Sequence, residues 1–226
     1  MSKKIVLLGD SIIDNTLYVE KHDVEQHLNT LLEDDTIVNH SIDGSTTVQV
    51  LDCISTCAFD KDTTHFVISV GGNNLLDKKQ FLLDTTVDDW YKTMLIQQDI
   101  YSEIGPDLIN VLKYTHYSGY MLDVEKIAVL LQYRYPKAKI MFLGLYEGNP
   151  SWNPEWKSVE HLLPGLINTH NEKLQHMIGS LSDNGISASY IDITNTLKQE
   201  DYFNDIEPND SGGLLIAEKI SAHITE

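Results

Sequence analysis

The chain has 226 residues, of which 42% are hydrophobic and 22% charged, a composition typical of a globular protein. It carries 16 Lys and Arg against 34 Asp and Glu, so its formal net charge is −18 at pH 7. This charge repels phosphate groups, so we expect neither nucleic-acid binding nor attachment to anionic membranes. No apolar run is long enough for a transmembrane helix, and Ile5–Leu8 is too short for a signal peptide. We therefore expect a cytoplasmic protein that forms a single domain over residues 1–226.

Short apolar runs alternate with amphipathic stretches along the chain. The apolar runs predict buried parallel strands at Ile5–Leu8, Thr36–Asn39, His65–Val70, Lys139–Leu145 and Ser189–Ile193. Hydrophobic residues recur at helical spacing around 24–32, 48–58, 124–131, 167–181 and 214–224, the last with Asn209 or Asp210 as its cap. This alternation predicts an α/β fold in which helices cover both faces of a parallel sheet of about five strands.

Two stretches, at about 75–120 and 147–164, lack this regularity and are expected to be irregular insertions. Each follows the carboxyl end of a predicted strand, where open α/β sheets bind their ligands. The second contains Trp152 and Trp156. These rings could form the floor of a sugar or acyl site, or could pack the insertion onto the body of the domain.

Three short motifs follow the first three predicted strands. Residues 9–11 (Gly-Asp-Ser) place Ser11 at a strand-to-helix junction, where amides at the start of a helix could stabilise an anion. Gly44 allows a close backbone approach to a ligand, and Asn73 could donate a side-chain N–H. Each motif could also be a simple turn. Together they predict a nucleophile and an oxyanion site at one edge of the sheet.

These motifs resemble those of the SGNH hydrolase superfamily, also called GDSL esterases and lipases, and the resemblance extends over most of the chain. It implies a flavodoxin-like three-layer α/β/α sandwich. It also implies that Ser11 is the nucleophile and that the oxyanion hole comprises the Ser11 N–H, the Gly44 N–H and Asn73. The neighbouring Asp10 and Asn74 are candidates for substrate binding, and Asn74 stands where the family usually has Asp.

The chain departs from this family at the Asp-x-x-His pair that usually precedes the last helix. Here Asn204 takes the Asp position and Glu207 takes the His position. An ordinary Glu is a weaker base than His by about 3 kcal/mol, although burial could recover much of the difference. We expect Glu207 to be the base, with Asn204 orienting it by a hydrogen bond. His40, after the second strand, is the best-placed alternative base.

The expected function is a serine-dependent ester hydrolase, or an acyl-transfer enzyme, that acts on a small-molecule ester or an acylated carbohydrate. The alternative is a pseudoenzyme that binds an acyl or carbohydrate ligand without turnover, because the usual His is missing. A nucleotide-binding flavodoxin-like domain is disfavoured because the sequence lacks the glycine-rich phosphate-binding motifs.

We expect no cofactor and no metal site. Cys53 and Cys57 are four residues apart and would share one face of a helix, but the pair alone supplies too few ligands for a metal ion. We expect both to be reduced thiols in or near the core. The His residues show no metal-binding spacing, and the oligomeric state is left open.

Overall fold

The computed structural model describes residues 2–76, 108–149 and 163–225. Five strands form one parallel sheet in the order β2-β1-β3-β4-β5. They are β1 (Lys4–Leu8), β2 (Thr36–Asn39), β3 (His65–Ile68), β4 (Lys139–Leu143) and β5 (Ala188–Ile191). This is the strand order of flavodoxin-like folds, so the predicted fold class is confirmed.

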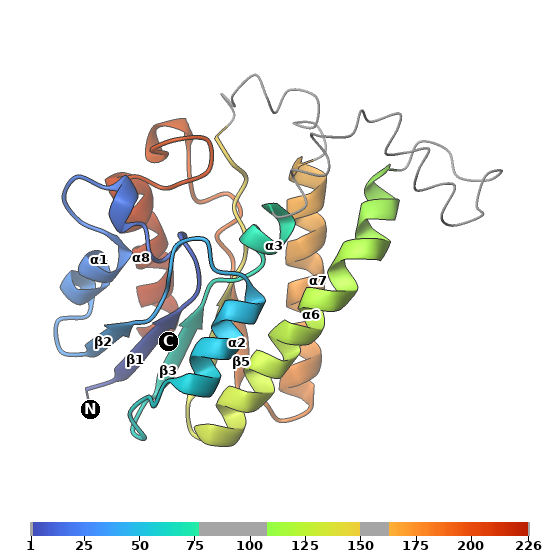
Figure 1. The fold of residues 1–226 in the computed structure, drawn as a ribbon. Coiled ribbons are helices and arrows are strands. Elements are labelled where there is room, and N and C mark those ends of the chain that lie inside the picture. The colour runs from blue at the N-terminus through green and yellow to red at the C-terminus, as the bar shows by residue number, and fades with distance from the viewer. Residues whose placement is uncertain (1, 77–107, 150–162, 226) are drawn as a thin grey trace.

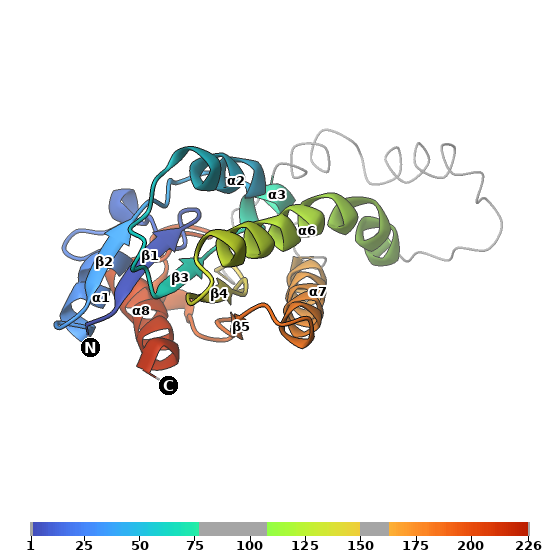
Figure 2. The same ribbon diagram turned by 90° about the horizontal axis from the view of Figure 1, so that it is seen from below.

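Helices cover both faces of the sheet, as Figures 1 and 2 show. One face carries α1 (Val24–Leu31) and α8 (Asp210–Thr225). The other carries α2 (Thr47–Thr56), α6 (Leu108–Arg134) and α7 (Leu163–Asp183). The short helix α3 (Gly72–Leu76) follows β3, and single 3-10 turns lie at Thr16–Tyr18 and Gln199–Asp201.

The interior strand β1 shows why the fold has two cores. Val6 and Leu8 pack under α2, α6 and α7, whereas Ile5 and Leu7 pack under α1 and α8. Because successive side chains of a strand point to opposite faces, a strand covered on both faces must be apolar throughout. This explains why the first apolar run predicted a buried strand.

β1 and β2 end where the sequence predicted, whereas β3, β4 and β5 each end two residues earlier. β3 ends at Ile68, and the next residue, Ser69, donates a hydrogen bond from its hydroxyl to Asp10. β4 ends at Leu143, and the backbone of Leu145 pairs with the side chain of Asn171. Polar groups therefore begin at the carboxyl edge of the sheet, where the candidate site lies.

The helix boundaries also differ from the prediction in places. α2 ends at Thr56, before Ala58. α6 begins at Leu108, inside the stretch expected to be irregular, whereas residues 77–107 and 150–162 lie outside the described residues. At α8 the prediction holds for Asn209, whose side chain accepts hydrogen bonds from the first amides of the helix.

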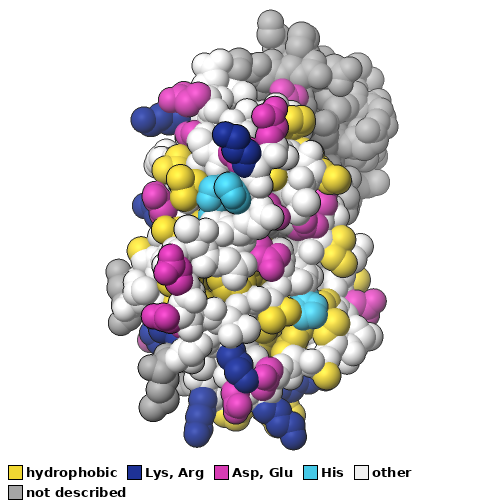
Figure 3. Space-filling model, turned by 90° about the vertical axis from the view of Figure 1, so that its left-hand side faces the viewer, with side chains coloured by type: hydrophobic (Ala, Val, Ile, Leu, Met, Phe, Trp, Pro, Cys, Tyr) yellow, Lys and Arg dark blue, Asp and Glu magenta, His cyan; other side chains and the backbone are white. Residues whose placement is uncertain are grey.

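The described surface agrees with the acidic composition. On the face in Figure 3, basic side chains of the described residues form no continuous patch. Within the same described part of the chain, no helix has both the length and the apolar character needed to cross a membrane.

Candidate active site

Ser11 lies in a tight turn at the carboxyl end of β1, beside β3, where the strand order of the sheet reverses. The turn needs glycine at position 9, which has a φ of +144° and would place a Cβ 2.2 Å from the Ser69 carbonyl oxygen. The Asp14 amide donates to the Asp10 carbonyl at 2.9 Å and closes the turn. The helix expected directly after Ser11 is absent here, because α1 begins only at Val24.

The hydroxyl of Ser11 meets the carboxylate of Glu207. Ser11 Oγ donates to Glu207 Oε1 at 3.3 Å, although the two residues are 196 positions apart. Both residues are less than 10% exposed. A serine next to a buried base, within hydrogen-bond reach, is the arrangement that nucleophilic catalysis requires.

Asn204 holds the backbone that carries Glu207. Its Oδ1 accepts hydrogen bonds from the amides of Ile206 at 2.9 Å and of Glu207 at 2.8 Å. Tyr146 adds a hydrogen bond from its hydroxyl to the Ile206 carbonyl at 2.7 Å. The hydrogen bond predicted between Asn204 and Glu207 is therefore made to the main chain of Glu207 and not to its carboxylate.

Burial changes the acidity of Glu207. The pKa of its carboxyl group is raised to about 7, mainly by burial and further by the negative charges of Asp43 and Asp10, while the hydrogen bond from Ser11 lowers it. Among the described residues, its second oxygen, Oε2, has no hydrogen-bond partner. A carboxylate with a pKa near 7 can accept a proton at neutral pH, as the His of the usual pair would.

Acidic and aromatic residues that the sequence analysis did not single out surround this pair. Asp43 accepts a hydrogen bond from the hydroxyl of Tyr18 at 2.8 Å, and its own amide donates to Asp14 at 3.0 Å. The ring of Tyr18 packs against Phe203, with 5.8 Å between the ring centroids. Burial and the hydrogen bond to Asp43 raise the pKa of Tyr18, so its hydroxyl stays protonated. In the sequence, the only indication that Asp43 lies near the candidate site was its position next to Gly44.

Two of the candidate oxyanion residues, Ser11 and Gly44, lie on adjoining loops, and Asn73 lies at the start of α3. Gly44 has a φ of +78°, and its loop is tied to the Ser11 turn because the Ile42 amide donates to the Gly9 carbonyl at 2.9 Å. Asn73 Nδ2 donates to the Ser45 carbonyl of the same loop at 3.0 Å. Within the described part of the chain, the amides of Ser11 and Gly44 donate to no acceptor, and Asn73 uses one of its two N–H groups.

Asp10 and Asn74 make contacts inside the protein. Asp10 is buried, and its Oδ1 accepts from Ser69 at 2.6 Å and from the Ile12 amide at 3.2 Å, while burial raises its pKa to about 6. Asn74 accepts a hydrogen bond from the Thr47 amide at 3.1 Å, at the start of α2. These contacts show how both side chains are held, and the substrate contacts expected of them stay a prediction. Trp152 and Trp156 lie outside the described residues.

His40 belongs to a different cluster from Ser11. Its ring packs edge-on against Phe59, with 5.2 Å between centroids, and lies beside Cys53 and Cys57. Of the two residues proposed as base from the sequence, Glu207 is therefore the one that the structure brings to Ser11.

Comparison with known proteins found no matching family model and no matching curated protein. Solved structures with the same fold were found. One is a phospholipase A1 from Streptomyces albidoflavus, with 13% identity over 98% of this chain and 100% of that chain, and a TM-score of 0.66. Another is a member of the lipolytic protein G-D-S-L family from Veillonella parvula, with 16% identity over 100% of both chains and a TM-score of 0.63.

A third similar structure is a mutant of an acetyl-xylooligosaccharide esterase from Geobacillus. It has 12% identity over 99% of this chain and 94% of that chain, and a TM-score of 0.62. At such low identities these likenesses show a shared fold, and this α/β fold is the one that these lipases and esterases adopt.

Proposed function

We propose that this protein is a serine-dependent ester hydrolase of the SGNH class, with Ser11 as the nucleophile and Glu207 as the general base. The observation that carries this proposal is the hydrogen bond from the Ser11 hydroxyl to the buried Glu207 carboxylate. The fold shared with lipases and esterases supports it.

In the proposed reaction, Ser11 Oγ attacks the ester carbonyl carbon while Glu207 accepts the hydroxyl proton. The negative charge that develops on the carbonyl oxygen is stabilised by the amides of Ser11 and Gly44 and by the free N–H of Asn73. Glu207 then returns the proton to the departing alcohol, leaving an acyl group on Ser11. A water molecule, deprotonated by Glu207, attacks this acyl-enzyme. Glu207 then returns the proton to Ser11 Oγ as the bond between Oγ and the acyl carbon breaks, and the carboxylic acid is released.

A glutamate base also accounts for the asparagine at position 204. A His base becomes a cation when it accepts a proton, and the usual Asp stabilises that cation. Glu207 instead becomes neutral when it accepts a proton, so it needs no anionic partner. Asn204 can therefore serve the backbone of the loop.

The surroundings of Ser11 favour an uncharged ester as substrate. The negative charges of Asp43 and Asp10 act on Glu207 and would repel an anionic substrate. Exposed apolar side chains adjoin Tyr18 and Asp43 and offer surface for an acyl chain: Leu17 is 75% exposed, Ile42 64% and Phe203 61%. An acylated carbohydrate or another neutral small ester meets both conditions.

The pH dependence of ester hydrolysis tests the assignment of the base. We expect kcat/KM for p-nitrophenyl acetate to rise with pH through about 7 and then level off, because only ionised Glu207 can accept the proton. If the His40→Ala variant shows the same rising limb, His40 is not the group that titrates, and the limb is assigned to Glu207. A limb near the ordinary pKa of glutamate would contradict a buried base.

Replacement of Asn73 by alanine tests the oxyanion site. We expect kcat to fall about 10²–10³-fold, because one donor to the developing oxyanion is lost. The matched control is Asn29→Ala, at an exposed position on α1, which should leave kcat unchanged. Equal kcat values in the two variants would remove Asn73 from the mechanism.

A further inference from the structure

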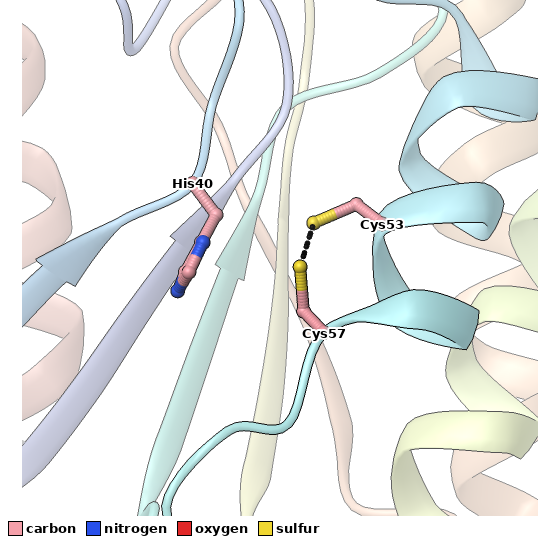
Figure 4. A group of neighbouring side chains, drawn as sticks. All are labelled: His40, Cys53 and Cys57. Atoms are coloured by element: carbon pink, nitrogen blue, oxygen red, sulfur yellow. Dashed lines mark hydrogen bonds between the residues drawn. The ribbon is translucent and has the colours of Figure 1, made fainter.

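Three side chains of types that can bind a metal ion lie together in a cluster that does not include Ser11. They are His40, directly after β2, and Cys53 and Cys57, at the end of α2. One ring nitrogen of His40 and the two sulfur atoms all lie within 4.8 Å of one another, and the two Sγ atoms are 3.5 Å apart. Figure 4 shows the Cys53 sulfur extending from α2 toward the His40 side.

The fold itself holds these side chains in place. His40 extends the β1–β2 pairing, since its amide donates to the Leu7 carbonyl at 2.9 Å. Cys57 is the C-cap of α2, and its amide donates to the Cys53 carbonyl at 2.8 Å. Phe59 packs against the His40 ring and also against Phe66 of the core. The cluster is therefore built on two regular elements and one core aromatic residue.

We propose that His40, Cys53 and Cys57 form a binding site for one Zn²⁺ ion, with a water molecule as the fourth ligand. A tetrahedral ion with Zn–S bonds of about 2.3 Å holds two sulfur atoms about 3.8 Å apart, close to the separation seen here. All three residues are half-buried, so an ion and a water molecule can reach them. Sulfur and imidazole ligands select such an ion over Mg²⁺ or Ca²⁺.

The site is balanced in charge when it is filled. One Zn²⁺ ion displaces the two thiol protons, and the two thiolates neutralise it while the imidazole stays neutral.

Zn²⁺ bound here would link the two ends of the segment that carries Gly44. His40 and Cys53 flank residues 41–52, which include Gly44 of the proposed oxyanion site. The ion would tie the carboxyl end of β2 to the last turn of α2 and so restrain the intervening loop. The proposed effect of the ion is to restrain this loop, and its binding can be measured independently of the proposed ester hydrolysis.

The test uses the full chain, reduced and freed of metal with a chelator. We expect it to bind one equivalent of Zn²⁺ and to unfold at a higher temperature when the ion is present. Co²⁺ should bind in its place with a tetrahedral absorption spectrum and a thiolate-to-cobalt charge-transfer band. These readouts do not depend on enzymatic activity.

Three variants and one control locate the site. Cys53→Ser and Cys57→Ser should each lose the charge-transfer intensity of one thiolate. Each should also weaken Zn²⁺ binding more than 100-fold, because loss of a residue that only hydrogen-bonds a metal ligand already weakens binding about 10–100-fold, and loss of the ligand itself has a larger effect. His40→Ala should weaken binding and keep both thiolate contributions. His176→Ala, at an exposed position on α7, should bind as the wild type does.

Two outcomes would overturn the proposal. One is Zn²⁺ binding of unchanged affinity in the double variant Cys53→Ser, Cys57→Ser. The other is a tetrahedral Co²⁺ spectrum that lacks thiolate bands in the folded wild-type protein. Circular dichroism of each variant shows whether loss of binding reflects a lost ligand or a lost fold.

Discussion

Replacement of Ser11 by alanine is expected to lower kcat/KM for ester hydrolysis at least about 10⁴-fold, because the nucleophile is removed. The small remaining rate should come from the oxyanion donors, which the substitution leaves in place. Hydrolysis of short-chain p-nitrophenyl esters by wild type and variant measures the effect. Thermal unfolding of both proteins shows whether the variant keeps its fold.

Ser41→Ala is the matched control for this experiment. Ser41 is also a buried serine that follows a strand, and among the described residues its hydroxyl has no hydrogen-bond partner. It should retain wild-type activity. If Ser11→Ala instead hydrolyses the same esters as fast as the wild type, Ser11 is not the nucleophile. If the wild type binds an acyl or carbohydrate ligand but turns over no ester, the protein is a pseudoenzyme.

Replacement of Glu207 by glutamine is expected to lower kcat about 10²–10⁴-fold, because the amide has nearly the same shape but cannot accept the Ser11 proton. The rising limb near pH 7 in the wild-type profile should be absent from the profile of the glutamine variant. Glu207→Asp tests the position of the base, because its shorter side chain keeps the carboxylate but places it farther from Ser11. A glutamine variant with the wild-type rate and the wild-type pH profile would exclude Glu207 as the base.

The same variant should change how stability depends on pH. The pKa of Glu207 is raised from 4.5 to about 7 on folding, so its contribution to stability is fully present below the unfolded value and is lost as pH rises through 7. Between pH 5 and pH 8, wild type should therefore lose up to about 3 kcal/mol that the glutamine variant does not lose. Denaturant unfolding at both pH values measures this difference. Asp10, whose pKa is also raised, is present in both proteins.

The sequence by itself was sufficient to predict the architecture. Apolar runs such as Ile5–Leu8 predicted buried strands, and helical periodicity between them predicted the layers. These signals are local, because the side-chain spacing of a strand or a helix depends only on neighbouring residues. Because the strands are parallel, the segments that follow β1, β2 and β3, which carry Ser11, Gly44 and Asn73, lie at one edge of the sheet.

Only the tertiary structure decided the chemistry of the candidate site. Ser11 and Glu207 meet across 196 positions of chain, and the pKa of Glu207 depends on burial and on the charge of Asp43, which no spacing encodes. Likewise, His40 approaches Cys53 only because β2 and the end of α2 pack together. Hydrogen bonds, desolvation and metal ligation depend on distances of a few ångströms between atoms, and folding alone sets those distances for residues far apart in the chain.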